Sequence, residues 1–334
     1  MITVSAVEAS NTLIKSSLPS RLVAVFIGAT SGIGESSLIH FAKYASLPRI
    51  HFVGRSQNAA DTITKRLHGV NPEGEYHFIK ADVSLLKRVD EVCKQIAEKE
   101  NISMSYFRAR APQNNNTETV TTENLNLIQA LSYYSRMRFI VNLLPFLREG
   151  PSLRRVITVL AGTKEGPINP QDAAGQKVAP WNARGHACSV MTLTLEEIAT
   201  QAPEISFIHD YPGYVKTPIG RTMKGLSGAV MKAYLPWLPL GQRHVFLATS
   251  SRYPSKKGKL DGSQNGIPLV KGLEVAVGAD GETGSGVYSV GAYGETGDVP
   301  CLRVLAQLRQ GGIRDKVWQH LQDEFLRITG RTTV

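Results

Sequence analysis

Short apolar runs alternate with amphipathic segments along most of this 334-residue chain. A short apolar run between turn residues is typical of a buried strand in a parallel sheet, and apolar residues at helical spacing are typical of the helices that cover such a sheet. The runs that predict strands are residues 22–27, 49–54, 76–79, 155–160 and 205–209, with one more beginning at residue 102. This alternation predicts an α/β protein with a doubly wound parallel sheet and helices on both faces.

The remaining segments predict helices and the two ends of the chain. Residues 1–20 are a short helical or irregular lead-in, and residues 258–297 are a glycine-rich loop with a hairpin at 287–290. Helical spacing predicts helices after Gly34, at residues 61–67, from residue 85, and at 124–147, 186–199, 301–309 and 313–328.

The stretch LVAVFIGATSGIG, residues 22–34, places a glycine-rich turn between the first predicted strand and the first predicted helix. In such a turn the first glycine permits a tight reversal, the middle one lets a pyrophosphate approach the main chain, and the last lets helix pack on strand. The helix N-terminus then faces the anion. This context predicts a Rossmann-type dinucleotide site formed by Gly28, Thr30, Ser31, Gly32, Ile33 and Gly34.

Arg55 follows the second predicted strand, residues 49–54. A site for NAD usually has an acidic residue near this strand end to bind the ribose hydroxyls, whereas an arginine accommodates the 2′-phosphate of NADP. No acidic residue follows Arg55 before Asp61. The sequence therefore predicts NADP(H) as the cofactor; the alternative is a solvated loop arginine.

The composition, 42% hydrophobic and 20% charged, is ordinary for a globular protein with a sizeable core. The net charge is +10, but lysines and arginines are scattered, which argues against a nucleic-acid partner. Cys93, Cys188 and Cys301 are odd in number and far apart, and indicate neither a disulfide framework nor a metal site. With no secretory signal and no apolar stretch long enough to be a transmembrane segment, we expect a cytoplasmic protein.

The glycine turn resembles the TGxxxGIG fingerprint of the short-chain dehydrogenase/reductase superfamily. The triplet at residues 81–83, Ala-Asp-Val, resembles the pair that this superfamily places against the adenine ring, although Asp82 or Ser84 are alternatively caps of the following helix. Residues 210–217, DYPGYVKT, resemble the turn that covers the nicotinamide. The resemblance implies cofactor contacts from Asp82, Val83, Pro212, Gly213, Val215 and Thr217.

The same resemblance implies a catalytic serine, and a tyrosine followed four residues later by a lysine that lowers its pKa. The serine position here has the sequence Ala-Gly-Thr, residues 161–163, and the asparagine that the superfamily has in its fourth helix is Ser132. The tyrosine and lysine positions fall on Val178 and Asn182, and shifted registers give Trp181 with Gly185 or Asn182 with His186. The usual catalytic residues are therefore absent.

Three residues are candidates for replacing this machinery. Thr163 can substitute for the serine as a hydrogen-bond donor, His186 carries a side chain that titrates near neutrality, and Tyr214 lies in the nicotinamide turn. Each has a structural alternative, because a histidine at a helix start commonly caps or packs, and a tyrosine beside Pro-Gly commonly forms a pocket wall.

Residues 220–250 occupy the place where the superfamily builds a substrate lid, and they are apolar here. An apolar lid predicts an apolar small-molecule substrate, and weak membrane-surface contact is the alternative. We accordingly expect a lead-in at residues 1–20, a dinucleotide-binding domain at 21–250, and a C-terminal part at 251–334 packed on the same domain.

Together with the blocks at residues 133–139 and 317–320, these features resemble fungal proteins of the superfamily that are associated with secondary-metabolite biosynthesis. The resemblance implies an NADPH-dependent reductase of a polyketide-, alkaloid- or terpenoid-like molecule that does not use Ser-Tyr-Lys. The alternatives are a non-redox cyclase or isomerase on the same scaffold, and a catalytically silent protein. The sequence leaves the oligomeric state open.

Overall fold

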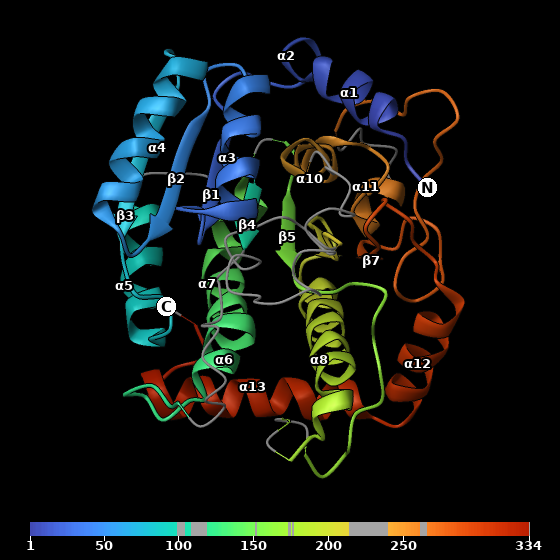
Figure 1. Ribbon diagram of the computed structural model, residues 1–334. Coiled ribbons are helices and arrows are strands. Elements are labelled where there is room, and N and C mark those ends of the chain that lie inside the picture. The colour runs from blue at the N-terminus through green and yellow to red at the C-terminus, as the bar shows by residue number, and fades with distance from the viewer. Residues whose placement is uncertain are drawn as a thin grey trace, which may run out of the picture.

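The computed structural model describes residues 1–98, 104–107, 119–150, 152–172, 175, 177–213, 240–260 and 266–333. A seven-stranded sheet lies at its centre in the order β3-β2-β1-β4-β5-β6-β7, and all neighbouring strands are parallel (Figure 1). The strands are β1 (Val23–Ile27), β2 (Arg49–Gly54), β3 (Glu75–Lys80), β4 (Met104–Phe107), β5 (Arg155–Val159), β6 (Ser206–Asp210) and β7 (Val287–Val290). The predicted doubly wound parallel sheet is confirmed.

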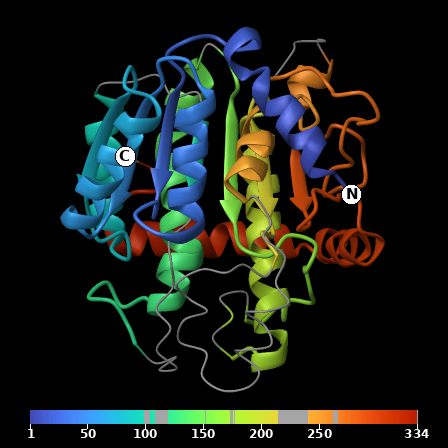
Figure 2. The same ribbon diagram turned by 45° about the horizontal axis from the view of Figure 1, so that its top comes forward.

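Helices cover both faces of this sheet (Figures 1 and 2). The helices on one face are α3 (Gly32–Tyr44), α4 (Gln57–Val70) and α10 (Leu240–Thr249), with the N-terminal α1 (Val4–Thr12) and α2 (Ile14–Ser17) beside them. The helices on the other face are α5 (Leu86–Ala97), α7 (Ser135–Glu149) and α8 (Pro180–Gln201). The C-terminal part contributes α11 (Lys256–Leu260), α12 (Val299–Gln310) and α13 (Ile313–Thr329). Helix α13 crosses the outside of the second layer and packs on α8 and α5 (Figure 2).

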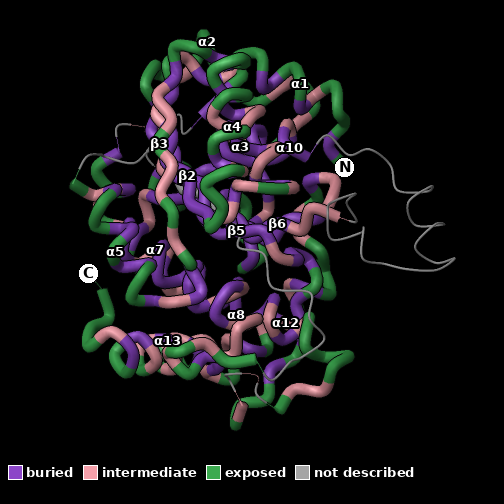
Figure 3. Tube along the Cα trace, turned by 60° about the vertical axis from the view of Figure 1, so that its left-hand side comes forward, coloured by how far each residue is buried: buried purple, intermediate pink, exposed green. Residues whose placement is uncertain are grey.

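The central strands are buried on both faces, which explains why their sequences are continuous apolar runs. Every residue of β1 is buried, and its side chains alternate between two hydrophobic clusters, with Ala24 and Phe26 in one and Val25 and Ile27 in the other. Buried residues follow the strands and the inward sides of the helices, whereas the outward sides are exposed (Figure 3).

The strand order reverses between β1 and β4. In doubly wound folds the carboxyl ends of the strands at such a point form the crevice in which ligands bind. Since the glycine turn directly follows β1, the fold places it at this crevice. The carboxyl edge of the sheet is therefore where the functional site belongs.

Two expectations for the second half of the chain are corrected by the structure. Residues 287–290 do not form a hairpin; they form β7, which is fully buried and pairs in parallel with β6. The flanking glycines suggested a local turn, whereas the true partner strand lies far away in the sequence. Residues 240–249, at the end of the predicted lid, form the buried helix α10 against α3; residues 214–239 lie outside the described residues.

Candidate active site

The glycine turn has the conformation that its sequence predicted. Gly28 and Gly32 have φ angles of 73° and 64°, in the left-handed region that favours glycine. A Cβ added to Gly34 would lie 2.8 Å from the carbonyl oxygen of Gly28, so only glycine lets α3 pack this closely on the turn. Ser31 is the N-cap of α3 and makes no side-chain capping bond. The first amides of α3 are thus left for an anion.

Arg55 lies at the carboxyl end of β2, beside the glycine turn. The two segments are in contact, because a Cβ on Gly54 would lie 2.4 Å from Cγ2 of Thr30. The Arg55 side chain is exposed, and no described residue forms a hydrogen bond or ion pair with it. Ser56 caps α4 through the amide of Ala59. The guanidinium is therefore available to a phosphate next to the turn.

Asp82 and Val83 follow β3 on the same edge. Oδ1 of Asp82 accepts hydrogen bonds from the amide and hydroxyl of Ser84, at 3.1 and 2.8 Å, while Val83 is buried. Neither Asp82 nor Ser84 caps α5, which was the alternative role. That helix is capped by the carboxylate of Glu123, which accepts from the amides of Leu86 and Lys87 at 2.5 and 3.0 Å.

The predicted long helix at residues 124–147 is interrupted near the site. It consists of α6 (Leu127–Gln129), a π-helical turn η1 (Ala130–Tyr134) and α7. Ser132, at the position of the superfamily's asparagine, lies in the middle of η1 and donates to the carbonyl oxygen of Ile128 at 2.7 Å. Single π-helical turns inside α-helices are frequent at functional sites. Helical spacing alone does not reveal such a turn.

The positions of the usual catalytic residues hold no tyrosine or lysine. Helix α8 begins at Pro180, earlier than the predicted start near residue 186, and its first turn faces solvent. Trp181 and Asn182 are exposed there, and Val178 is half-buried just before the helix. Ala161 is buried at the serine position.

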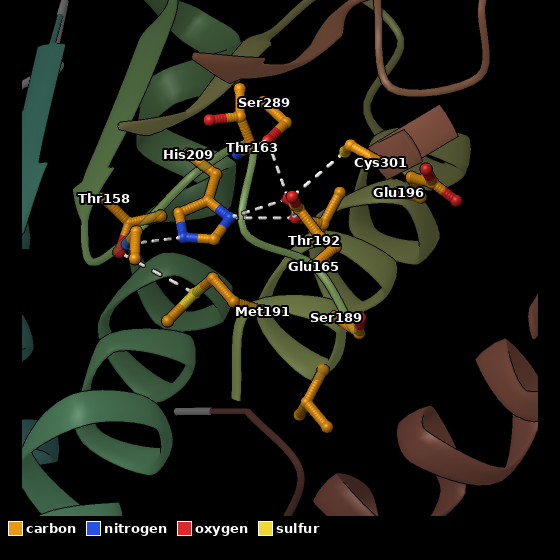
Figure 4. Close-up of polar contacts among 12 residues, drawn as sticks. Thr158, Thr163, Glu165, Ser189, Met191, Thr192, Glu196, His209, Ser289 and Cys301 are labelled. Carbon is orange, nitrogen blue, oxygen red and sulfur yellow. Dashed lines mark hydrogen bonds and ion pairs between the residues drawn. The ribbon is translucent and has the colours of Figure 1, made fainter. Parts of the chain in front are cut away.

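Thr163 follows β5 in a backbone conformation that threonine rarely adopts. Its φ angle is 65°, and for a β-branched residue a positive φ is strained. The amide of Thr163 donates to Oγ of Ser289 at 2.6 Å, which holds the backbone in place (Figure 4). The side-chain hydroxyl makes no hydrogen bond to any described residue.

A buried carboxylate fixes this segment. Oε1 of Glu165 accepts from the hydroxyls of Thr192 and Ser289, at 2.7 and 2.6 Å, and Oε2 accepts from the thiol of Cys301 at 3.0 Å (Figure 4). Burial would raise the pKa of Glu165, but the contact with His209 and the bonds from Cys301 and Ser289 lower it to about 2. The carboxylate is therefore ionised, and it anchors the backbone of Thr163 through Ser289.

His209, on β6, completes the same cluster. Its Nε2 accepts from the amide of Ala161 at 3.2 Å, so Nδ1 carries the ring proton. Nδ1 lies 2.8 Å from the hydroxyl of Thr192, which in turn donates to Glu165. These contacts join the loop after β5 to β6, β7, α8 and α12 (Figure 4). The cluster supports the site and, being fully buried, does not itself contact a substrate.

His186 is buried on α8 and lines a small cavity of about 50 Å³. The cavity lies against the π-helical turn, and its other lining residues include Ser132, Leu160 and His320. His320, on α13, accepts or donates a 2.7 Å hydrogen bond with the hydroxyl of Tyr134. Thr163 is not among the residues that line this cavity.

Tyr211 marks the carboxyl end of β6. Two cations lie over its ring, the guanidinium of Arg184 at 4.9 Å and the ammonium of Lys164 at 5.9 Å from the ring centroid. Pro212 and Gly213 follow it, and Gly213 has a φ of 74°. Tyr214, Val215 and Thr217 lie outside the described residues. The clustering of Lys164, Arg184 and Tyr211 was not predicted, because they lie on three different elements.

No established protein-family profile matches the chain. It is 37% identical over 333 residues to oxidoreductase AN1596 of Emericella nidulans, with 96% of this chain and 97% of the relative covered. It is 36% identical over 335 residues to the NmrA-like family domain-containing oxidoreductase notO of an Aspergillus species, with 97% and 95% covered. The short-chain dehydrogenase/reductase SAT2 of Stachybotrys chartarum is 28% identical over 330 residues, with 90% and 91% covered.

Solved structures share the fold at lower sequence identity. One is an L-sorbose reductase from Gluconobacter frateurii complexed with NADPH and L-sorbose, with a TM-score of 0.53, 18% identity, and 76% of this chain and 98% of that chain covered. Another is the MalC reductase/Diels-Alderase from Malbranchea aurantiaca, with a TM-score of 0.52, 17% identity, and 72% and 92% covered.

The strand order and the glycine turn define a dinucleotide-binding fold of the short-chain dehydrogenase/reductase type. With its similarity to AN1596 and notO along almost the whole chain, the protein belongs to the fungal oxidoreductases of this type. In the described part of the chain, no helix has both the length and the apolarity needed to span a membrane.

Proposed function

We propose that this protein is a cytoplasmic, NADPH-dependent reductase of an apolar small molecule, of the polyketide, alkaloid or terpenoid kind, and that it works without the Ser-Tyr-Lys mechanism. One observation carries the proposal. The carboxyl edge of the sheet retains every described element of a dinucleotide site, whereas the positions of the tyrosine and lysine hold a half-buried valine, Val178, and an exposed asparagine, Asn182.

The described residues fit NADPH. The uncapped amides at Gly32 and Ile33 suit the pyrophosphate, the free guanidinium of Arg55 suits the 2′-phosphate, and Asp82 and Val83 suit the adenine. The relationship to named oxidoreductases, and the NADPH in the L-sorbose reductase complex, support this assignment. When bound, NADPH supplies a hydride, and the protein supplies position and electrostatic environment.

The protein's own residues favour a substrate that is already activated. An iminium accepts a hydride at carbon and becomes a neutral amine, so its reduction needs no proton. An activated C=C bond accepts the hydride at its electrophilic carbon, and water can protonate the resulting carbanion, so neither reaction needs a tyrosine acid. The hydroxyl of Thr163, held in place through Ser289 and Glu165, can donate a hydrogen bond to a polar atom of such a substrate. Tyr211, between Lys164 and Arg184, is the described titratable side chain nearest in sequence to the turn at Pro212. The apolar composition of residues 220–238 supports an apolar substrate.

The test is equilibrium binding followed by turnover. Purified protein should bind NADPH more tightly than NADH. When the protein is mixed with NADPH and a fungal extract that contains the candidate substrate, one NADPH should be oxidised for each product molecule formed. NADPH binding that is no tighter than NADH binding would contradict the cofactor assignment. Product formation without NADPH oxidation would contradict the assignment as a reductase.

The second candidate function is a non-redox cyclase or isomerase. The absence of the tyrosine and lysine favours it, because a pocket can hold an apolar substrate in the conformation that cyclises without a tyrosine proton donor. A protein with the same fold is described as both a reductase and a Diels-Alderase. The NADPH stoichiometry separates the two candidates.

A further inference from the structure

Three buried side chains form a hydrogen-bonded chain across one face of the sheet. Oγ of Ser37 lies 2.7 Å from Nδ1 of His244, and Nε2 of His244 lies 2.9 Å from Oδ2 of Asp210. All three residues are buried, with exposed fractions of 1%, 3% and 4%. Ser37 also donates to the carbonyl oxygen of Ile33 at 2.8 Å.

The hydrogen-bonded chain Ser37-His244-Asp210 joins the pyrophosphate end of the proposed cofactor site to its nicotinamide end. Ser37 and Ile33 lie in the first two turns of α3, directly after the glycine turn that suits the pyrophosphate. Asp210 is the last residue of β6, directly before the segment that resembles the nicotinamide turn. His244 stands between them on α10, which packs tightly on α3; a Cβ on Gly241 would lie 2.5 Å from the carbonyl oxygen of Ser36.

Both ring nitrogens of His244 are hydrogen-bonded within this chain of side chains, Nδ1 with the hydroxyl of Ser37 and Nε2 with the carboxylate of Asp210. The ring therefore links α3 to β6 through both of its polar atoms, and the buried carboxylate of Asp210 has a partner in the interior.

A Ser-His-Asp chain invites comparison with a nucleophilic triad, but the geometry argues against that role. The serine hydroxyl is directed at a main-chain carbonyl of its own helix. All three side chains are buried between α3, α10 and β6, where a substrate cannot reach the serine. The chain is a connection between elements.

We propose that His244 is a positioning residue that fixes the separation between the pyrophosphate-binding turn and the nicotinamide end of the site. The proposal rests on the NADP(H) site proposed above. A ligand that spans two subsites gains from both only when their spacing is set in advance. Loosening the connection should therefore weaken the whole dinucleotide and spare a ligand that occupies the adenine end alone.

The experiment measures the Kd of NADPH and of adenosine 2′,5′-bisphosphate for a set of variants. His244→Gln keeps a donor near Asp210 and loses the bond to Ser37. His244→Asn keeps a polar group near Ser37 and loses the bond to Asp210. The matched control is Thr249→Val, which removes a buried hydroxyl of the same helix that bonds the carbonyl of Val245. Thermal unfolding is recorded for each variant.

We expect both His244 variants to bind NADPH about 5- to 150-fold more weakly, the usual range of coupling between sites, while the bisphosphate Kd stays within twofold of wild type. The control should lower Tm without changing either Kd. The double variant His244→Gln with Asp210→Asn, a neutral amide pair, should recover part of the NADPH affinity of His244→Gln.

Other results overturn the inference. If both ligands bind more weakly by the same factor, the Ser37-His244-Asp210 connection acts only through α3. Unchanged Kd values at a lowered Tm would mean that its role is structural alone. If wild-type protein binds neither ligand, the proposed cofactor site itself is wrong, which is a distinct result.

Discussion

The carboxyl edge of the sheet is built in two different ways on its two sides. At the ends of β1 to β3, the groups proposed to bind the cofactor are main-chain amides and glycines, with Arg55 exposed beside them. At the ends of β5 to β7, the loop is held by a buried network of side chains around Glu165. The first side needs a particular backbone, and the second needs particular side chains from distant segments. Apart from the connection through His244, substitutions at the ends of β5 to β7 should therefore leave the proposed cofactor contacts at the ends of β1 to β3 unchanged.

Removing the carboxylate of Glu165 should have the largest effect on this contrast. Glu165→Leu leaves the hydroxyls of Thr192 and Ser289 without their acceptor, and should cost about 3–5 kcal/mol of unfolding free energy. Glu165→Gln keeps the shape and should cost less. Chemical denaturation measures both, with the exposed Glu91→Gln, whose pair with Arg88 lies on the surface, as the control. A Glu165→Leu loss as small as the control's would mean that the network does not hold the loop.

Because of the same network, the free energy of unfolding should decrease as the pH is lowered into the acid range. The pKa of Glu165 is about 2 in the folded protein and 4.5 ordinarily, so folding favours the ionised form. Its contribution, about 3 kcal/mol, is complete above pH 4.5 and is lost as the pH falls towards 2. Unfolding free energies measured from pH 6 to pH 2 should fall less steeply in Glu165→Gln than in wild type. Parallel curves for the two proteins would contradict the low pKa.

These two sides also differ in how far the sequence predicts them. The glycine turn and Arg55 are contiguous with their strands, so local pattern and spacing are enough to assign them. Glu165 bonds residues that lie 27, 124 and 136 positions away. No local pattern marks such pairs, and the contacts of Tyr211 and His244 are equally remote in sequence. The π-helical turn at Ser132 has no local signature either, because its residues keep ordinary helical periodicity.

Arg55→Glu tests the first side directly. It removes the charge-assisted contact proposed between Arg55 and the 2′-phosphate and adds repulsion, so NADPH should bind about 100-fold more weakly while NADH binding changes little. Fluorescence titration with the two cofactors measures this difference. Arg66→Glu, on α4 and ion-paired with Glu35, is a nearby control for general charge. Equal losses for both cofactors in Arg55→Glu would show that the guanidinium does not read the 2′-phosphate.

Thr163 tests the second side with a smaller effect. Thr163→Gly removes the strain of a positive φ and should raise the unfolding free energy by about 1 kcal/mol, while deleting the hydroxyl should lower kcat/KM about tenfold. Thr163→Ser keeps the hydroxyl and should retain most activity. Denaturation and kinetics on the same preparations separate the two effects. Full activity of Thr163→Gly would remove this residue from the site.

Restoring the superfamily's tyrosine and lysine should have the smallest effect of all. In the variant Val178→Tyr with Asn182→Lys, the lysine projects from the exposed first turn of α8 and the tyrosine from the half-buried residue just before it. Neither side chain is held by surrounding hydrogen bonds like those around Glu165. Catalytic groups that are displaced by about 1 Å lose most of their rate enhancement. Simple ketones should therefore not be reduced, and Tm should change little. NADPH oxidation with these ketones is compared between the double variant and each single variant. Rapid oxidation by the double variant would mean that a tyrosine and a lysine at these two positions are enough to form a catalytic site without a supporting shell of buried side chains.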